Sequence, residues 1–138
     1  MRKITIDLNV ILDFLGHRRG HCEAAVIYDL CATKRIKGLL CAHEVTTLSY
    51  FLFKELKDPD NVRMIITEIL DTFSTIPVTE TILRGALTSA ITDFEDAVVE
   101  ISSLKQNVDF IVTGNLSDFA ECRVPAISPK QFLQELDD

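Results

Sequence analysis

The chain has 138 residues, of which 47% are apolar and 25% charged, with only five Gly and four Pro. This length suits one domain of ordinary size, and the composition excludes disordered, collagen-like and low-complexity proteins. The formal net charge of −7 has the wrong sign for binding nucleic acid through a broad basic surface, although an acidic site with bound metal ions can still attract phosphates. We therefore expect a single domain over residues 1–138.

No segment is expected to enter a membrane. The longest run without a charge or His covers Val45 to Phe53, nine residues, against the roughly 18–20 that span a bilayer. Only three residues separate the basic start of the chain from Asp7, which is too few for a signal peptide. The four cysteines lack metal-finger spacing, and a chain with this core needs no disulfides. These features favour a protein of the reducing cytoplasm.

Hydrophobic periodicity divides the chain into alternating strands and helices. Asn9 is a plausible N-cap for the first helix, and Pro59 ends a helix because it cannot continue the hydrogen-bond ladder. Tyr50, Phe51 and Phe53 are expected in the core. In chain order, the predicted elements are a strand over 3–6, helices over 9–15 and 22–33, a strand over 37–41, helices over 43–57 and 61–73, a strand over 75–78, helices over 79–89 and 93–105, strands over 109–113 and 124–127, and a helix from Ser128.

Short apolar strands that alternate with helices predict an α/β fold. The central parallel sheet would have four to five strands and would be covered by helices on both faces. In such sheets, binding sites lie outside the C-terminal ends of the strands, near the point where the strand order reverses. The positions of the acidic residues can be compared with this rule.

Acidic and amide side chains follow the predicted strands at four separate places. Their carboxylates would repel one another unless a cation or a shared proton intervened. All-oxygen ligation suits Mg²⁺ or Mn²⁺, and the chain has no competing set of Cys or His ligands. The residues concerned are Asp7, Glu44, Asp93, Glu95, Asp96, Asn115 and Asp118.

Some of these residues also have simpler structural interpretations. Glu95 and Asp93 could serve only as caps at a helix N-terminus. Asn115 could be a turn residue, and Asp118 could cap the turn before Phe119. For Asp7 the functional interpretation is stronger, because the ends of strands in a covered sheet are partly desolvated.

Three segments together resemble the PIN domain family. They are residues 6–13 (IDLNVILD), 93–97 (DFEDA) and 113–119 (TGNLSDF), and the resemblance extends over the whole chain in the right order. It implies a three-layer α/β/α sandwich and a ribonuclease that depends on Mg²⁺ or Mn²⁺. Many small bacterial members are toxins of the VapC type, so the resemblance also implies an antitoxin partner, an RNA substrate and a homodimer.

The resemblance assigns roles to individual residues. Carried over by motif, Asp7 would be the first metal ligand, and Asn9 would brace it. Asp96 would be the main acid of the second motif, with Asp93 beside it. Asn115 and Asp118 would form the last group, and Thr113 would position their loop. Asp7, Glu44, Asp96, Asn115 and Asp118 would be the metal ligands, while Asp7, Asp93, Asp96 and Asp118 would act in catalysis.

Two departures from the family pattern concern this site. The family's second acid normally lies within the helix after the second strand, whereas Glu44 is near the start of that helix, and Thr47 is an alternative for this position. Position 115 is Asn where many members carry Asp, which removes one negative charge.

The implied reaction is phosphodiester hydrolysis. A metal ion would activate a water molecule and neutralise charge on the phosphate, and Asp93 or Asp118 would orient or deprotonate that water. A catalytically weak PIN-like scaffold that binds RNA or protein is the main alternative, and the direction of Glu44 discriminates between the two. The start of the chain also resembles haloacid dehalogenase phosphatases, but Asn9 replaces their second Asp.

Overall fold

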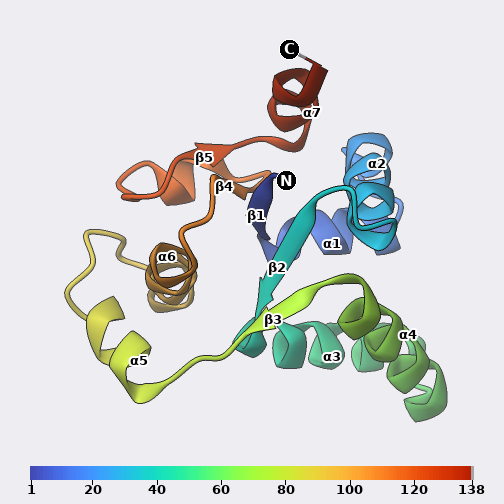
Figure 1. Cartoon of the computed structure of the whole chain (residues 1–138). Helices are drawn as coiled ribbons and strands as arrows, with labels where there is room; N and C mark the ends of the chain where they lie inside the picture. Colours follow the sequence, from blue (N-terminus) through green and yellow to red (C-terminus); the bar gives the residue numbers. More distant parts are fainter. Residues whose placement is uncertain (138) are drawn as a thin grey trace.

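The computed structural model describes residues 1–137, which form a parallel sheet covered by helices on both faces (Figure 1). No helix within this range is both long and apolar enough to cross a membrane. In chain order the elements are β1 (Lys3–Ile6), α1 (Leu8–Leu15), α2 (His21–Ala32), β2 (Lys37–Cys41), α3 (Ala42–Leu56), α4 (Pro59–Thr72), β3 (Ser74–Ile76), α5 (Glu80–Ala86), α6 (Phe94–Gln106), β4 (Phe110–Val112), the 3₁₀ helix η1 (Leu116–Phe119), β5 (Ala126–Ile127) and α7 (Pro129–Asp137).

The strands run parallel in the order β3-β2-β1-β4-β5 within the described chain. Thr5 in the central strand β1 pairs with Leu39 of β2 on one side and with Ile111 of β4 on the other. The chain builds outward from β1 through β2 and β3 and then returns for β4 and β5. The C-terminal ends of β1 and β4 therefore flank the topological switch point, where parallel sheets place their sites.

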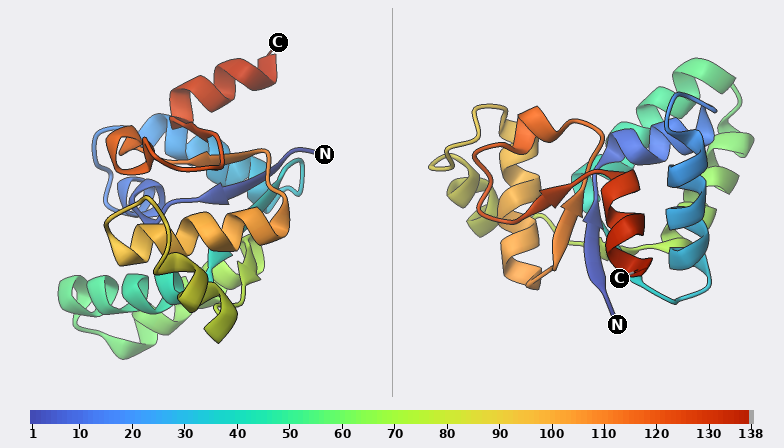
Figure 2. Two further views of the ribbon diagram at one scale, coloured as in Figure 1. Left: turned by 90° about the vertical axis from the view of Figure 1, so that its left-hand side faces the viewer. Right: turned by 90° about the horizontal axis from the view of Figure 1, so that it is seen from above.

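Two apolar cores, one on each face of the sheet, make the fold a three-layer α/β/α sandwich, as predicted. One core contains Ile4 and Ile6 of β1 and lies under α1, α2, α3, α4 and α7. The other contains Leu39 of β2 and Ile111 of β4 and lies under α5 and α6. Figure 2 shows α6 on one side of the strands and α2 on the other. Alternation of side chains along each strand supplies both cores.

The N-cap of the first helix lies two residues earlier than predicted. Asp7, rather than Asn9, occupies the N-cap position of α1, because its extended backbone (φ −72°, ψ 140°) leads from β1 straight into the helix. The Asp7 carboxylate makes no hydrogen bond to the first turn of α1. It is therefore available for other interactions at the end of β1.

The prediction that three aromatic residues of α3 lie in the core is wrong. Tyr50, Phe51 and Phe53 are 63%, 40% and 51% exposed, whereas Leu48 and Leu52 are the apolar residues of this helix that are buried. Leu48 and Leu52 are four residues apart and thus share one face of the helix. The three aromatic side chains lie on the remaining faces and form an exposed surface.

Candidate active site at the ends of β1 and β4

Asp7 is held at the C-terminal end of β1 by contacts with β4 and its loop. Its backbone N–H donates a hydrogen bond to Val112 O (2.9 Å), and Thr113 Oγ1 donates one to Asp7 Oδ2 (2.8 Å). The residue is only 4% exposed. Burial raises the pKa of Asp7, and the negative charge of Asp118 raises it further. The hydrogen bond from Thr113 lowers the pKa and so offsets part of this rise. Asp7 is thus a fixed, partly desolvated carboxylate.

The Thr113 hydroxyl also organises the loop that follows β4. Its Oγ1 accepts a hydrogen bond from Asn115 N (3.0 Å) while it donates to Asp7. Asn115 itself is exposed at the start of η1. Among the residues described, no hydrogen bond joins the Asn9 side chain to Asp7, so the brace visible here is Thr113.

Glu44 lies in the first turn of α3 and turns inward, toward Asp7. It is 5% exposed, and its Oε2 accepts a hydrogen bond from Leu8 N (3.1 Å). Its Oε1 is buried without a hydrogen-bond partner among residues 1–137. Burial, followed by the charge of Asp7, raises the pKa of Glu44 well above its usual value. The alternative residue, Thr47, instead donates its hydroxyl proton to His43 O (3.1 Å) within α3.

The N-terminus of α6 carries the acids of the DFEDA segment. Asp93 is the N-cap, and its Oδ1 accepts a hydrogen bond from Asp96 N (3.0 Å). Asp96 is half-buried, and burial together with the charges of Asp93, Asp7 and Asp118 raises its pKa to about 7. Glu95 is exposed and makes no capping bond in the described chain. Asp93 therefore has the capping role that the sequence left open, and it lies beside Asp96.

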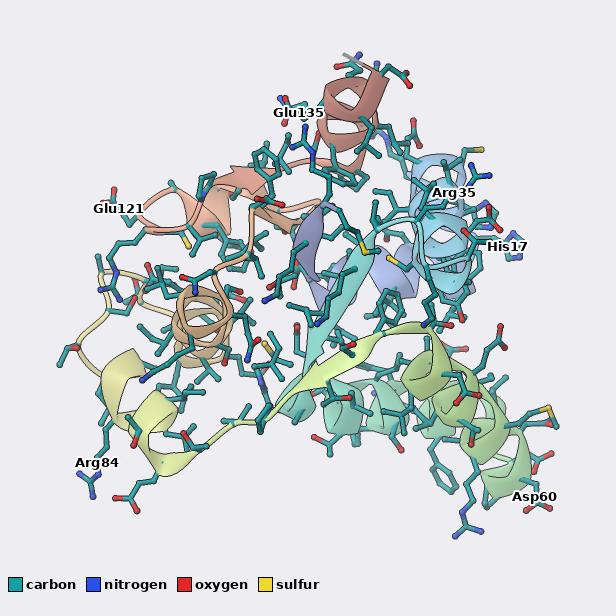
Figure 3. The ribbon with its side chains drawn as sticks, in the orientation of Figure 1. His17, Arg35, Asp60, Arg84, Glu121 and Glu135 are labelled. Atoms are coloured by element: carbon teal, nitrogen blue, oxygen red, sulfur yellow. The ribbon has the colours of Figure 1, made fainter. Side chains whose placement is uncertain are left out.

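A hollow of about 280 Å³ opens next to these acids. Its walls come from the loop before α6 and from the segment around η1, which lie side by side in Figures 1 and 2. Figure 3 shows Glu121 on the loop between η1 and β5. Glu121 could not be singled out from the sequence, because only its position three residues after Asp118 distinguishes it from other exposed acidic residues. The lining residues are Ala90, Ile91, Thr92, Asp93, Asp96, Ser117, Asp118 and Glu121.

The acids of the four sequence segments are close enough to perturb one another. Asp7 and Asp96 each raise the pKa of Glu44, and Asp118 raises that of both Asp7 and Asp96. However, no three Asp, Glu, His or Cys side chains of residues 1–137 already stand in the arrangement of a metal site. Asp7 and Glu44 are buried, while Asp93 and Asp118 are exposed on the walls of the hollow.

This donor set fits a divalent cation. The converging groups are carboxylates, which are the ligands that Mg²⁺ and Mn²⁺ prefer. The buried Oε1 of Glu44 has no partner among residues 1–137, and a cation would supply one. The cation would also offset the carboxylate repulsion that, together with burial, raises the pKa of Asp96. The residues therefore suit such an ion.

A protein-family model covers most of the chain. The sequence model of the PIN domain matches residues 3–117. No curated protein matches the chain at a significant level.

Solved structures of similar fold include toxin–antitoxin complexes. The VapBC2 complex from Rickettsia felis, bound to a DNA fragment from its promoter, has a chain that is 13% identical, with a TM-score of 0.70 over 91% of this chain and 97% of that one. A toxin–antitoxin complex from Klebsiella pneumoniae gives 18% identity and a TM-score of 0.67 over 92% and 98% of the two chains. The protein PAE2754 from Pyrobaculum aerophilum gives 17% identity and 0.67 over 99% and 90%.

Proposed function

This chain belongs to the PIN domain family, and from that membership we propose that it is an endoribonuclease that depends on Mg²⁺ or Mn²⁺ and hydrolyses RNA phosphodiester bonds. The single observation that carries the proposal is the inward direction of Glu44, which buries an unpartnered carboxylate oxygen beside Asp7. Burying a second carboxylate beside Asp7 costs desolvation and repulsion that a bound cation would offset, which favours the metal-dependent enzyme over a scaffold. The whole chain, residues 1–138, would act as one domain.

The metal ion would be held by Asp7, Glu44 and Asp96, with Asp118 and Asn115 completing the set. When bound, it would stabilise negative charge on the attacked phosphate and lower the pKa of a water molecule. Glu44 favours this assignment over Thr47, since the Thr47 hydroxyl is engaged within its own helix.

The remaining residues would position the reacting groups. Thr113 holds Asp7 Oδ2 and thereby fixes the direction of that carboxylate. Asp93 Oδ1 is occupied as the cap of α6, so Asp118 is better placed to orient the attacking water and accept its proton. Water then supplies the oxygen of the new P–O bond, and the leaving ribose oxygen takes up a proton as its own P–O bond breaks.

Cleavage of single-stranded RNA tests this proposal. We expect slow cleavage with Mg²⁺ or Mn²⁺, no cleavage in EDTA, and a loss of about a hundredfold or more in Asp7→Asn and Asp96→Asn, because each removes a charged ligand. Asp29→Asn, the same chemical change on the exposed side of α2, is the matched control. Cleavage that persists in EDTA or in both site variants would overturn the proposal, and RNA binding without cleavage would favour a scaffold.

The proposed partners are an antitoxin and a second copy of the chain. Structures of similar fold are found in toxin–antitoxin complexes, which supports the antitoxin. For the homodimer, α3 offers the exposed aromatic surface formed by Tyr50, Phe51 and Phe53.

All four cysteines are free in the described chain, which accords with the proposed action in the cytoplasm.

Self-association is expected to depend on this aromatic surface. Phe53→Ser should shift the protein toward monomer. Phe53 is 51% exposed in the isolated chain, and a dimer that buries this side chain would lose apolar contact area when Ser replaces it. The melting temperature should change little, since the side chain lies outside the core. Sedimentation velocity at high micromolar concentration measures the effect. A wild-type protein that is wholly monomeric there would count against the homodimer.

A further inference from the structure

A third buried carboxylate, Glu100, lies in the middle of α6, outside the acid cluster. It is 1% exposed and is surrounded in sequence by apolar and small residues, VVEISS. Its Oε1 accepts a hydrogen bond from Ser89 Oγ (2.6 Å), and its Oε2 accepts one from Arg123 N (2.8 Å). The Arg123 side chain adds two longer bonds, from Nε to Oε2 (3.5 Å) and from Nη2 to Oε1 (3.4 Å).

These partners keep Glu100 ionised in the fold. Burial alone would raise its pKa, but the hydrogen bonds from Ser89 and Arg123 outweigh burial, and the pKa lies below its usual value. An apolar side chain at position 100 could fill the same space in the core. Each carboxylate oxygen of Glu100 accepts a hydrogen bond from a different loop, which neither an apolar side chain nor a side-chain amide can reproduce in this geometry.

The partners of Glu100 belong to the two loops that form the walls of the acidic hollow. Ser89 precedes α6, and its Oγ also accepts a hydrogen bond from Ile91 N (3.0 Å), so it fixes the segment that leads to Asp93. Arg123 follows η1 and closes the segment that carries Asp118. Ile91 lines the hollow on one wall, and Asp118 lines it on the other. Glu100 thus joins the two walls through one side chain.

We propose that Glu100, together with Ser89 and Arg123, forms a clamp that holds both walls of the hollow against α6, so that Asp96 at the start of α6 and Asp118 on the opposite wall reach the same divalent cation. The inference rests on the proposed function of the hollow as a metal site. Glu100 is a positioning residue, since it acts through the loops and touches neither the ion nor the RNA. Groups that orient metal ligands typically change metal affinity by about 10–100-fold when they are replaced.

Mn²⁺ affinity, measured on the full-length protein by electron paramagnetic resonance of free Mn²⁺, tests the clamp without reference to RNA cleavage. We expect Glu100→Gln to raise the Kd for Mn²⁺ about tenfold, because a neutral amide cannot accept both loop hydrogen bonds. Ser89→Ala, a milder change that removes the 2.6 Å bond, should raise it in the same direction. Hydrogen–deuterium exchange should increase in residues 89–93 and 117–123 in both variants.

The matched control is Ile27→Val, which removes a methyl group from the core on the opposite face of the sheet. It should lower the melting temperature while leaving the Kd for Mn²⁺ at its wild-type value. The clamp is overturned if Glu100→Gln and Ser89→Ala bind Mn²⁺ within twofold of wild type, or if their Kd values rise no more than that of Ile27→Val. If wild-type protein shows no Mn²⁺ binding that Asp7→Asn abolishes, the proposed metal site fails, and the clamp's role fails with it.

Discussion

Asp96→Asn is expected to raise the melting temperature of the metal-free protein by several degrees at pH 8. Asp96 has a pKa of about 7 in the fold, against 3.8 for an ordinary Asp, because it is half-buried beside Asp93, Asp7 and Asp118. Its ionisation therefore opposes folding. Allowing for solvent screening of a partly exposed carboxyl, removal of the charge should stabilise the fold by about 1–2 kcal/mol, or about 3–6 °C for a domain of this size.

The pH dependence has a definite sign. Below pH 4 the carboxyl is protonated in both folded and unfolded chains and contributes nothing. Between pH 4 and pH 7 the folded state holds the proton more tightly, so the stability of wild-type protein falls as the pH rises through this window. Thermal melts of wild type, Asp96→Asn and the control Asp29→Asn at pH 4.5 and pH 8 measure the difference. A destabilised Asp96→Asn at pH 8 would show that the acids do not converge.

Mn²⁺ is expected to stabilise the protein strongly at pH 8 and weakly at pH 5. An ion bound only by the folded state adds about 2.7 kcal/mol to the free energy of unfolding at a hundredfold excess over Kd. Protons on Glu44 and Asp96 compete with the ion, because both groups have a raised pKa in the metal-free fold. Melting curves with and without Mn²⁺ at the two pH values measure the effect.

Glu44→Gln should separate metal binding from folding. Burial and the charge of Asp7 raise the pKa of Glu44, so its negative charge does not stabilise the metal-free fold, and Gln has nearly the same shape and no charge. The free energy of unfolding without metal should therefore not fall by more than about 1 kcal/mol, while most of the Mn²⁺ stabilisation is lost. Thr47→Val is the control from the same helix. A full Mn²⁺ response in Glu44→Gln would contradict the assignment of this residue as a ligand.

The sheet and its order of elements could be predicted from sequence because each strand is short, apolar and bounded by clear turn or helix signals. β1 and β2 begin and end where the sequence predicts them, at Lys3–Ile6 and Lys37–Cys41. Asp7 directly after β1 and the polar residues that follow β4 then indicated the candidate site, since the C-terminal ends of parallel strands share one edge.

The helix faces could not be predicted with equal success. From Val45 to Phe53, α3 is apolar on nearly every side, so the 3.6-residue period does not say which side packs inward. Contact with β2 and with α1 and α4 decides it, burying Leu48 and Leu52 and leaving Tyr50, Phe51 and Phe53 outside.

The direction of the Glu44 side chain also could not be predicted from the sequence. The sequence placed Glu44 near the start of α3 and left Thr47 open, because the two are almost one helical turn apart. Packing of α3 against α1 brings Glu44 Oε2 to Leu8 N, a contact between residues 36 positions apart. The contacts of Glu100 could not be predicted for a similar reason. Its hydrogen-bond partners Ser89 and Arg123 lie 11 and 23 residues away, on loops that only the fold brings together.

Crystals soaked in Mn²⁺ give the most direct test that the acids at the ends of β1 and β4 hold a divalent cation. The account predicts an anomalous difference peak with carboxylate oxygens of Asp7, Glu44 and Asp96 at about 2 Å, and no peak in Asp7→Asn crystals. A peak elsewhere on the surface, or no peak between Asp7 and Asp96 at Mn²⁺ concentrations that support RNA cleavage, would contradict it.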